Sequence, residues 1–405
     1  MEEETNKSIK VPKNIKFNLL EVIIIMIITI IFGIVLGTLI TTSKEYNHDF
    51  NSNYDEEIAI FKEAYNKIVD EYYETVDKKV LIEKAINGMF NYLGDPYSTY
   101  MNEEETEALM ERLNGEYAGV GMEITANADG TANVVRIFKN SPASETDIKP
   151  GDKITLIDDQ SLTDLSISEI ANLIKGPINT KVKINTISDN EEKEYVITRK
   201  SVNIDSITYK LINNNQKISY ISIDLFAANT NDQFKKALDT AFKDGVTGLI
   251  IDVRNNTGGY LDTVSDMASQ FMDRSHIIYQ LQTKDKISKI YSTEKKNLNV
   301  DVVVLINEIS ASASEILAAA LQESYGALIV GTQSYGKGTV QKATTLRNGA
   351  TLKYTIQKWL TPNGNWINET GITPTHYIEL NEEYFKNPIE ENDNQLQEAI
   401  KLLTK

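Results

Sequence analysis

The chain has no cysteine among its 405 residues and only three histidines. The absence of cysteine excludes a disulfide framework and any metal site built on thiolates. Neither His-Glu-x-x-His nor Gly-x-x-x-x-Gly-Lys-Ser/Thr occurs, so the sequence carries no zinc-helix or phosphate-loop motif. We therefore expect no metal and no cofactor. His48, His276 and His376 lie outside any motif that would direct an imidazole at a serine.

Basic residues are also scarce, because 41 lysines and arginines face 58 aspartates and glutamates and leave a net charge of −17. The four lysines and four glutamates that precede Ser43 cancel, so the whole excess of negative charge lies downstream. An acidic surface repels nucleic acid phosphates, and no basic patch interrupts it. We expect no nucleic acid partner, and the acidity is typical of a soluble globular surface.

One long apolar run is present, the 19 uncharged residues Val22–Ile40. A helix of this length, at about 1.5 Å per residue, spans the apolar core of a bilayer. Signal-peptide apolar regions are shorter, about 7–15 residues, and no Ala-x-Ala-like site follows. An uncleaved anchor is therefore favoured over a cleaved signal peptide or a buried helix of the soluble core.

The charges around this run predict the orientation in the membrane. Four lysines precede it, whereas only Lys44 follows closely, so the positive-inside rule places the N terminus in the cytoplasm. The prediction is a single-pass cell-membrane protein. It has a cytoplasmic tail over residues 1–17, an anchor over residues 18–41 and an extracytoplasmic remainder.

Downstream of the anchor the hydrophobic pattern changes three times. Residues 54–115 repeat apolar side chains every three to four positions, as helices do, and we assign this stripe to a core. Its members are Ile58, Phe61, Tyr65, Ile68 and Tyr72. Residues 116–201 are strand-rich with one helical pattern. Residues 202–380 alternate short apolar runs with helices, which indicates an α/β fold. Residues 381–405 end in a short amphipathic helix that either pairs chains or caps the core.

A serine-rich turn is the first part of the candidate chemistry. The apolar strand at 302–306 leads into Ser310-Ala311-Ser312-Ala313-Ser314-Glu315, and a helix rich in alanine follows. Ser312 is therefore expected at a helix N terminus, where unpaired amides are partly positive. Ser310 and Ser314 compete with it for the role of nucleophile, although each could equally be a cap or a packing residue.

Lys337 is the second part, and it lies between Gly336 and Gly338. A serine hydroxyl is a poor nucleophile until a base takes its proton. A lysine can act as that base where burial disfavours its charged form. The pattern thus indicates Ser312 as nucleophile and Lys337 as base, without histidine.

These motifs resemble those of the carboxy-terminal processing proteases, also called tail-specific proteases. The resemblance covers roughly residues 55–376 in the family's order. It rests on Asp95-Pro96-Tyr97-Ser98-Thr99-Tyr100, Asp252-Val253-Arg254-Asn255-Asn256-Thr257-Gly258-Gly259, Asn307-Glu308-Ile309-Ser310-Ala311-Ser312-Ala313-Ser314-Glu315-Ile316 and Gly336-Lys337-Gly338-Thr339-Val340-Gln341.

The resemblance implies a multidomain serine endopeptidase that works through an acyl-enzyme. Its core would be an α/β fold of the crotonase- or ClpP-like type, behind a transmembrane helix, a helical segment and a PDZ-like domain. The match assigns the nucleophile to Ser312 and the base to Lys337, oriented by Gln341. It assigns the oxyanion donors to the amides of Gly258 and Ala313. Thr257 and Tyr260 depart from the family's usual proline and leucine.

The resemblance also makes the loop at 117–122 the carboxylate-binding loop of a PDZ domain. A glycine-rich backbone exposes N–H groups that can hold a chain-terminal carboxylate, although these glycines could instead only shape a turn. The candidate substrate-binding residues are Gly119, Val120, Gly121 and Met122. The expected partner is a polypeptide with an apolar C terminus. Asn179 stands where the family has a second glycine in the turn after Gly176.

Two other functions stay open. A catalytically silent binding or scaffold protein on the protease fold would not need Ser312, Lys337 and Gln341, so their presence argues against it. A Ser-His-Asp hydrolase would need a Gly-x-Ser-x-Gly elbow, which is missing, and His376 lies far downstream. A homodimer or higher oligomer is also compatible with the sequence. We further expect an unliganded PDZ-like module to hold Lys337 out of reach of Ser312.

Overall fold

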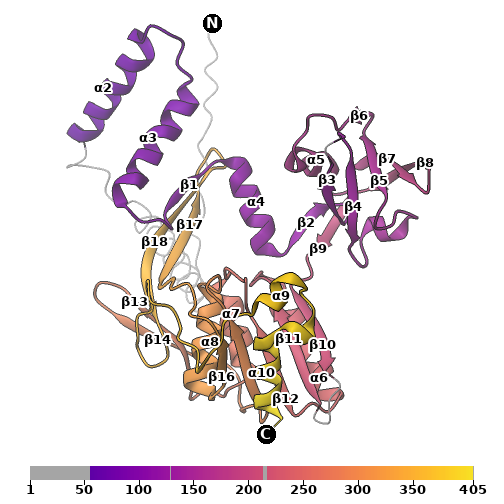
Figure 1. Ribbon diagram of the computed structural model, residues 1–405. Coiled ribbons are helices and arrows are strands. Elements are labelled where there is room, and N and C mark those ends of the chain that lie inside the picture. Colours follow the sequence, from indigo (N-terminus) through magenta and orange to yellow (C-terminus); the bar gives the residue numbers. More distant parts are fainter. Residues whose placement is uncertain (1–54, 128, 213–216, 405) are drawn as a thin grey trace, which may run out of the picture. The chain divides into compact units, whose positions relative to one another are not determined.

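The computed structural model describes residues 55–127, 129–212 and 217–404 (Figure 1). The anchor segment Val22–Ile40 and His48 lie outside these residues. Across the described ranges, no helix is both long and apolar enough to cross a membrane. The chain divides into two compact units, Met1–Lys84 and Ala85–Lys405.

Two helices confirm the helical pattern of the N-terminal region, α2 (Asp55–Glu71) and α3 (Lys78–Leu93). The Asp77 carboxylate accepts hydrogen bonds from the amides of Lys79 and Val80 at 2.8 and 3.1 Å, which starts α3. The prediction that the apolar stripe lies in a core is wrong for most of it. Ile58, Phe61, Ile68 and Tyr72 are 60%, 48%, 45% and 54% exposed. A helical period identifies an apolar face but not what covers it.

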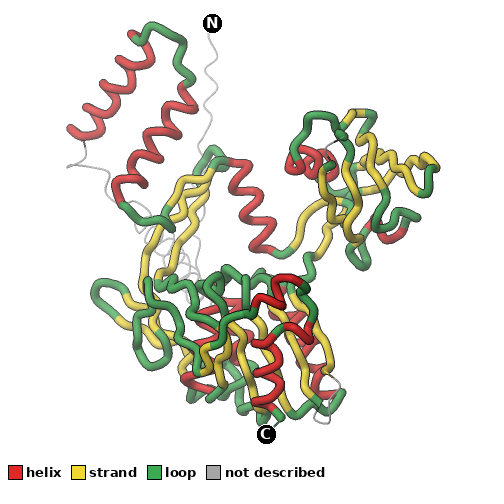
Figure 2. The backbone as a smooth tube through the Cα atoms, in the orientation of Figure 1, coloured by secondary structure: helices red, strands yellow, loops and turns green. Residues whose placement is uncertain are grey.

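Within the second unit, helix α4 (Glu103–Asn114) leads into a strand-rich module with its own apolar core. α4 starts at a reciprocal cap, in which Asn102 and Glu105 bond to each other's amides, and ends at Gly115 with φ 72°. Figure 2 shows the strands of the module in yellow. Its elements are β2 (Glu116–Gly119), β3 (Met122–Ala126), β4 (Ala132–Ile137), η1 (Pro142–Glu145), β5 (Lys153–Ile157), β6 (Gln160–Ser161), α5 (Ile167–Ile174), β7 (Lys181–Ser188), β8 (Glu191–Thr198) and β9 (Lys200–Asn203).

Strand β7 shows why this segment folds as a sheet. Alternate residues of β7 are buried, among them Val182 and Ile184, which matches the two-residue period of a strand with one covered face. The turn before β7 places Asn179 at φ 69°. Asparagine is one of the few residues besides glycine that adopt this conformation readily, so it replaces the family's glycine without losing the turn.

The domain that follows is built on a six-stranded sheet with helices on both faces. The strand order is β10 (Ile207–Ile212), β11 (Ile218–Ile223), β12 (Gly248–Asp252), β15 (Asp301–Ile306), β16 (Leu328–Gly331) and β19 (His376–Tyr377). Only β10 pairs antiparallel; the other strands are parallel. Parallel strands covered on both faces read as unbroken apolar runs, as β12 and β15 do.

Alternate side chains of the core strands pack against different helices. Leu249 and Ile251 share a cluster with residues of α6 (Thr230–Lys243), α7 (Leu261–Ser269) and α8 (Ala313–Ala320). Ile250 belongs to a second cluster with Leu396 and Ala399 of α10 (Asn394–Leu403). The amphipathic helix expected at the C terminus thus covers the second face of the sheet.

A separate five-stranded sheet brings an N-terminal motif to the core. It contains β1 (Thr99–Met101), β13 (Ile277–Gln282), β14 (Ile287–Tyr291), β17 (Thr339–Thr345) and β18 (Thr351–Leu360). β1 and β17 both pair with β18. The pairing places residues 95–100 near the strand that follows Lys337. The remaining elements are η2 (Leu321–Tyr325), α9 (Glu382–Lys386) and η3 (Glu390–Asn392).

Candidate active site

Three loops meet at one edge of the core sheet. Strands β12, β15 and β16 are parallel neighbours, so their carboxyl ends lie together, which is where α/β sheets place their sites. The loops that follow them carry Gly258, Ser312 and Lys337. These three residues and Gln341 line a single cavity of about 370 Å³. The fold therefore brings together residues that are up to 83 positions apart in sequence, from Gly258 to Gln341.

Ser312 precedes α8 and has an unusual backbone conformation. Its φ and ψ are 56° and −114°, outside the regions that a residue with a side chain ordinarily occupies. Such strain costs about 1–3 kcal/mol and is frequent at functional sites. Ser312 also lines the cavity.

The two competing serines are held elsewhere. Ser310 donates from Oγ to the Val253 carbonyl oxygen at 2.8 Å, and Ser314 donates from Oγ to the Asn256 carbonyl oxygen at 2.8 Å. Both side chains are fully buried. They fasten the serine turn to the loop that carries Gly258, so neither is placed to attack a substrate.

Gly258 lies against the serine turn. A Cβ atom at this position would come within 2.9 Å of Ser312 Cβ and 3.0 Å of the Ala313 nitrogen. The Ala313 N–H meets no acceptor among the residues that the structure describes. The Gly258 N–H, by contrast, donates to Asn256 Oδ1 at 2.8 Å. One expected oxyanion donor is thus available, and the other is engaged by a side chain of its own loop.

Lys337 is half-buried in a setting that favours its neutral form. Its Nζ lies 5.0 Å from the centre of the Tyr97 ring. Burial, together with the charge of Lys353, lowers the pKa of Lys337 to about 8, against the opposing effect of Glu315 and Asp95. Within the described residues, no hydrogen bond joins its amine to Ser312 Oγ. Gln341 donates from Nε2 to Thr339 and Thr355 at 2.9 and 3.1 Å rather than to the lysine.

Sequence reasoning assigned no role to two residues of this site, Glu315 and Tyr97. Glu315 is fully buried and binds the backbone of both Ser312 and Lys337. Its position three residues after Ser312, at the start of a helix, is a signal that could have found it. Tyr97 reaches Lys337 only through the pairing of β1 with β18, and local sequence does not reveal that pairing.

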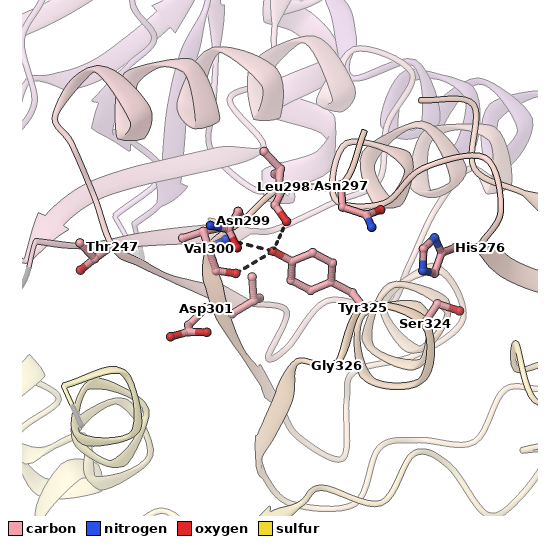
Figure 3. Close-up of a pocket in the computed structure, with 11 residues that line it drawn as sticks. Thr247, His276, Asn297, Leu298, Asn299, Val300, Asp301, Ser324, Tyr325 and Gly326 are labelled. Atoms are coloured by element: carbon pink, nitrogen blue, oxygen red, sulfur yellow. Dashed lines mark hydrogen bonds between the residues drawn. The ribbon is translucent and has the colours of Figure 1, made fainter. Parts of the chain in front are cut away.

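His276 and His376, the two histidines in the part of the chain that the structure describes, do not form a catalytic triad. Asp273, Ser275 and His276 lie together in one turn, but both partners contact the same ring nitrogen, Nδ1, at 3.1 and 3.3 Å. A triad needs the acid on one nitrogen and the serine on the other. Figure 3 shows His276 at a separate pocket beside Tyr325 and Asn297. His376 contacts Thr375 through Nδ1.

A second cavity, of about 380 Å³, lies in the groove of the strand-rich module. Met122 and Ile124 of β3 line it together with Ile174 of α5. Of the four predicted substrate-binding residues, Val120 is fully buried in the core of the module, and Met122 faces the groove. Helix α4 contributes Arg112 to this groove and to the cavity of Ser312.

Family models match three consecutive segments of the chain. Residues 38–106 match the N-terminal domain of the activating protease CtpB, residues 110–187 match the PDZ domain, and residues 217–378 match peptidase family S41. The carboxy-terminal processing protease CtpB of Bacillus subtilis is 35% identical over 87% of this chain and 73% of its own length. This chain belongs to the carboxy-terminal processing proteases of family S41.

Other relatives agree with this membership. CtpA of Bacillus subtilis is 35% identical over 78% of this chain and 68% of its own length. The "Probable CtpA-like serine protease" of Staphylococcus haemolyticus is 36% identical over 79% of this chain and 64% of its own. This chain therefore spans about two thirds of the length of these curated relatives. A solved structure from Bacteroides fragilis, assigned to the S41 proteases, covers 78% of this chain at 16% identity with a TM-score of 0.50, which shows a shared fold.

Proposed function

We propose that the protein is a serine endopeptidase with a Ser312–Lys337 dyad that cleaves extracytoplasmic polypeptides selected by their apolar C termini. One observation carries the proposal. A half-buried lysine with a pKa of about 8 shares one cavity with a strained serine at a helix N terminus. Lysine on a surface does not meet this description, and no other base is needed.

The reaction follows from the positions of the groups. Ser312 Oγ attacks the scissile carbonyl while Lys337 takes its proton, and the resulting oxyanion is held by the amides of Ala313 and Gly258. Lys337 then gives the proton to the leaving amine, and water hydrolyses the acyl-enzyme. For this the Gly258 N–H has to leave Asn256 Oδ1, and the lysine amine has to come within about 3 Å of Ser312 Oγ. We infer that a peptide in the PDZ groove favours that arrangement.

The remaining parts of the proposal concern recognition and location. The groove between β3 and α5 is lined mainly by apolar side chains, which suits the last side chain of an apolar tail. The apolar run Val22–Ile40 and the lysines before it support a membrane anchor with the catalytic domain outside the cytoplasm. The alternative, a catalytically silent scaffold, would keep the groove without needing the strained Ser312.

The first test is cleavage of a loosely folded reporter that ends in either an apolar or a charged tail. The full chain is expected to cleave the apolar-tailed reporter at least about tenfold faster, because most of the side chains that line the groove are apolar and gain contact only with an apolar tail. The Ser312→Ala variant is the control and should cleave neither. Equal cleavage rates for both reporters would be consistent with the Ser312–Lys337 dyad but would contradict selection of substrates by the PDZ groove. Absence of cleavage by the wild-type chain on either reporter would favour the scaffold.

The second test is the pH dependence of kcat/KM. The charged form of Lys337 cannot accept the serine proton, so activity should be lost below its pKa of about 8. The rate should fall by about tenfold per pH unit on the acid side and level off about one unit above the pKa. An optimum near pH 6 would exclude Lys337 as the base.

Lys353 provides an electrostatic control for this profile. It lines the same cavity, and its charge lowers the pKa of Lys337, whereas Glu315 and Asp95 raise it. Removing that charge in Lys353→Met should raise the pKa of Lys337 and move the acid limb to higher pH. If the acid side of the kcat/KM profile lies at the same pH in Lys353→Met as in the wild type, the proposed environment of the Lys337 amine is wrong.

A further inference from the structure

Glu315 lies between the two loops that carry the dyad. Its side chain is 0% exposed. Oε1 accepts hydrogen bonds from Ser334 Oγ at 2.6 Å and from the Gly336 amide at 2.7 Å. Oε2 accepts from the Ser312 amide at 2.8 Å and from the Lys337 amide at 2.9 Å. A single carboxylate oxygen therefore joins the backbone of the nucleophile to the backbone of the base.

The chemistry of the four donors requires a carboxylate. Four hydrogens converge on two oxygen atoms, and an ionised carboxylate is the side chain that only accepts at both of them. A glutamine of the same shape would present its NH₂ group to two of the donors. Burial raises the pKa of Glu315, and the four donors oppose that rise because they stabilise the charged form.

The bond to Ser312 restrains the strained part of the site. Its φ of 56° and ψ of −114° persist only if surrounding contacts hold the residue there. The Ser312 N–H is a direct contact of this kind, because it donates to the Glu315 carboxylate. The same carboxylate oxygen, Oε2, also accepts the hydrogen bond from the Lys337 amide. The lysine side chain is flexible, so its amine can be positioned only if the Lys337 backbone is fixed.

We propose that Glu315 is a positioning residue that sets the separation of Ser312 and Lys337. It acts through their backbone amides and does not touch the reacting atoms. This inference rests on the proposed Ser312–Lys337 dyad.

Glu315→Gln in the full chain is expected to lower kcat by about 10²-fold and to leave KM within about twofold, because displaced reacting groups cost a factor of this size whereas tail binding is remote. Glu308→Gln is the matched control. Glu308 lies on the same loop and is exposed, and Thr332 Oγ1 donates a hydrogen bond to it at 3.0 Å. It should keep the wild-type kcat. A Glu315→Gln enzyme with kcat within about threefold of wild type would overturn the proposal.

Glu315→Asp decides the case in which the glutamine variant does not fold. Aspartate keeps the charge but is one methylene shorter, so it cannot span both loops. A reduced kcat with a wild-type unfolding temperature supports the proposal, and a full kcat overturns it.

Hydrogen exchange tests whether Glu315 holds the two loops, and it does not depend on a measurement of cleavage. In Glu315→Gln the peptides spanning 310–316 and 333–338 should both exchange faster, whereas the amides of β15 should keep their wild-type rates. Unchanged exchange in the two loops would overturn the proposal even if kcat falls. If the wild-type chain cleaves no reporter, the proposed function fails, and the exchange data still decide whether Glu315 holds the loops.

Discussion

Lys337→Met is expected to lower kcat by at least about 10³-fold while the protein stays folded, because the general base is removed and the side chain keeps its length. Methionine suits the half-buried site, where the end of the Lys337 side chain lies over the Tyr97 ring, since thioethers make favourable contacts with aromatic rings. The measurement is kcat on the apolar-tailed reporter, with the unfolding temperature determined in parallel.

A double variant makes this prediction sharper. Ser312→Ala alone should lower kcat by about 10⁶-fold, because without the hydroxyl no acyl-enzyme forms. The effects of substituting two residues that act as a unit do not add, so kcat of Ser312→Ala/Lys337→Met should be no lower than kcat of Ser312→Ala. A Lys337→Met enzyme that keeps more than about a tenth of the wild-type kcat would show that another group takes the serine proton. Losses that multiply in the double variant would show that the two residues act separately.

Sequence predicted the parts of the site that depend on local pattern. Parallel strands buried on both faces read as apolar runs, so 248–252 and 302–306 were recognisable, and the residues after them had to meet at one edge. The place of Ser312 in the turn after the second strand follows from this pattern, whereas the role of Gly258 came only from the family resemblance. The same reasoning could not choose among Ser310, Ser312 and Ser314 by chemistry alone, because all three can bond a nearby backbone group. The structure separates them by their partners.

The features that sequence did not predict depend on contacts between distant segments. Tyr97 reaches Lys337 because β1 pairs with β18, and the register of that pair is set by tertiary packing. The bond from Gly258 to Asn256 Oδ1 depends on a single rotamer. The apolar stripe on α2 was recognisable from its helical period, but the prediction that it is buried was wrong, because the period does not reveal what packs against it.

Arg254→Met is expected to lower the stability of the core by about 3–5 kcal/mol, because it leaves two buried carboxylates without their cation. Arg254 pairs with Asp252 at the end of β12 and with Asp393 at the start of α10, at 2.6 and 2.8 Å. Arg254 also donates to Gln395 at 2.8 Å. The two ion pairs of Arg254 therefore connect α10, which covers one face of the sheet, to β12, the strand that leads to Gly258.

Lys401→Met is the matched control for this prediction, because it breaks an exposed pair on the same helix. Lys401 and Glu398 are 2.8 Å apart on the surface of α10, and such pairs contribute about 0–1 kcal/mol. The two tryptophans, Trp359 and Trp366, both lie in the core domain, so their fluorescence in a denaturant titration reports its unfolding. A loss in Arg254→Met no larger than that in Lys401→Met would mean that α10 is held by its apolar contacts alone. A large loss accompanied by reduced kcat would mean that the docking of α10 also supports the loop carrying Gly258, since Arg254 begins that loop.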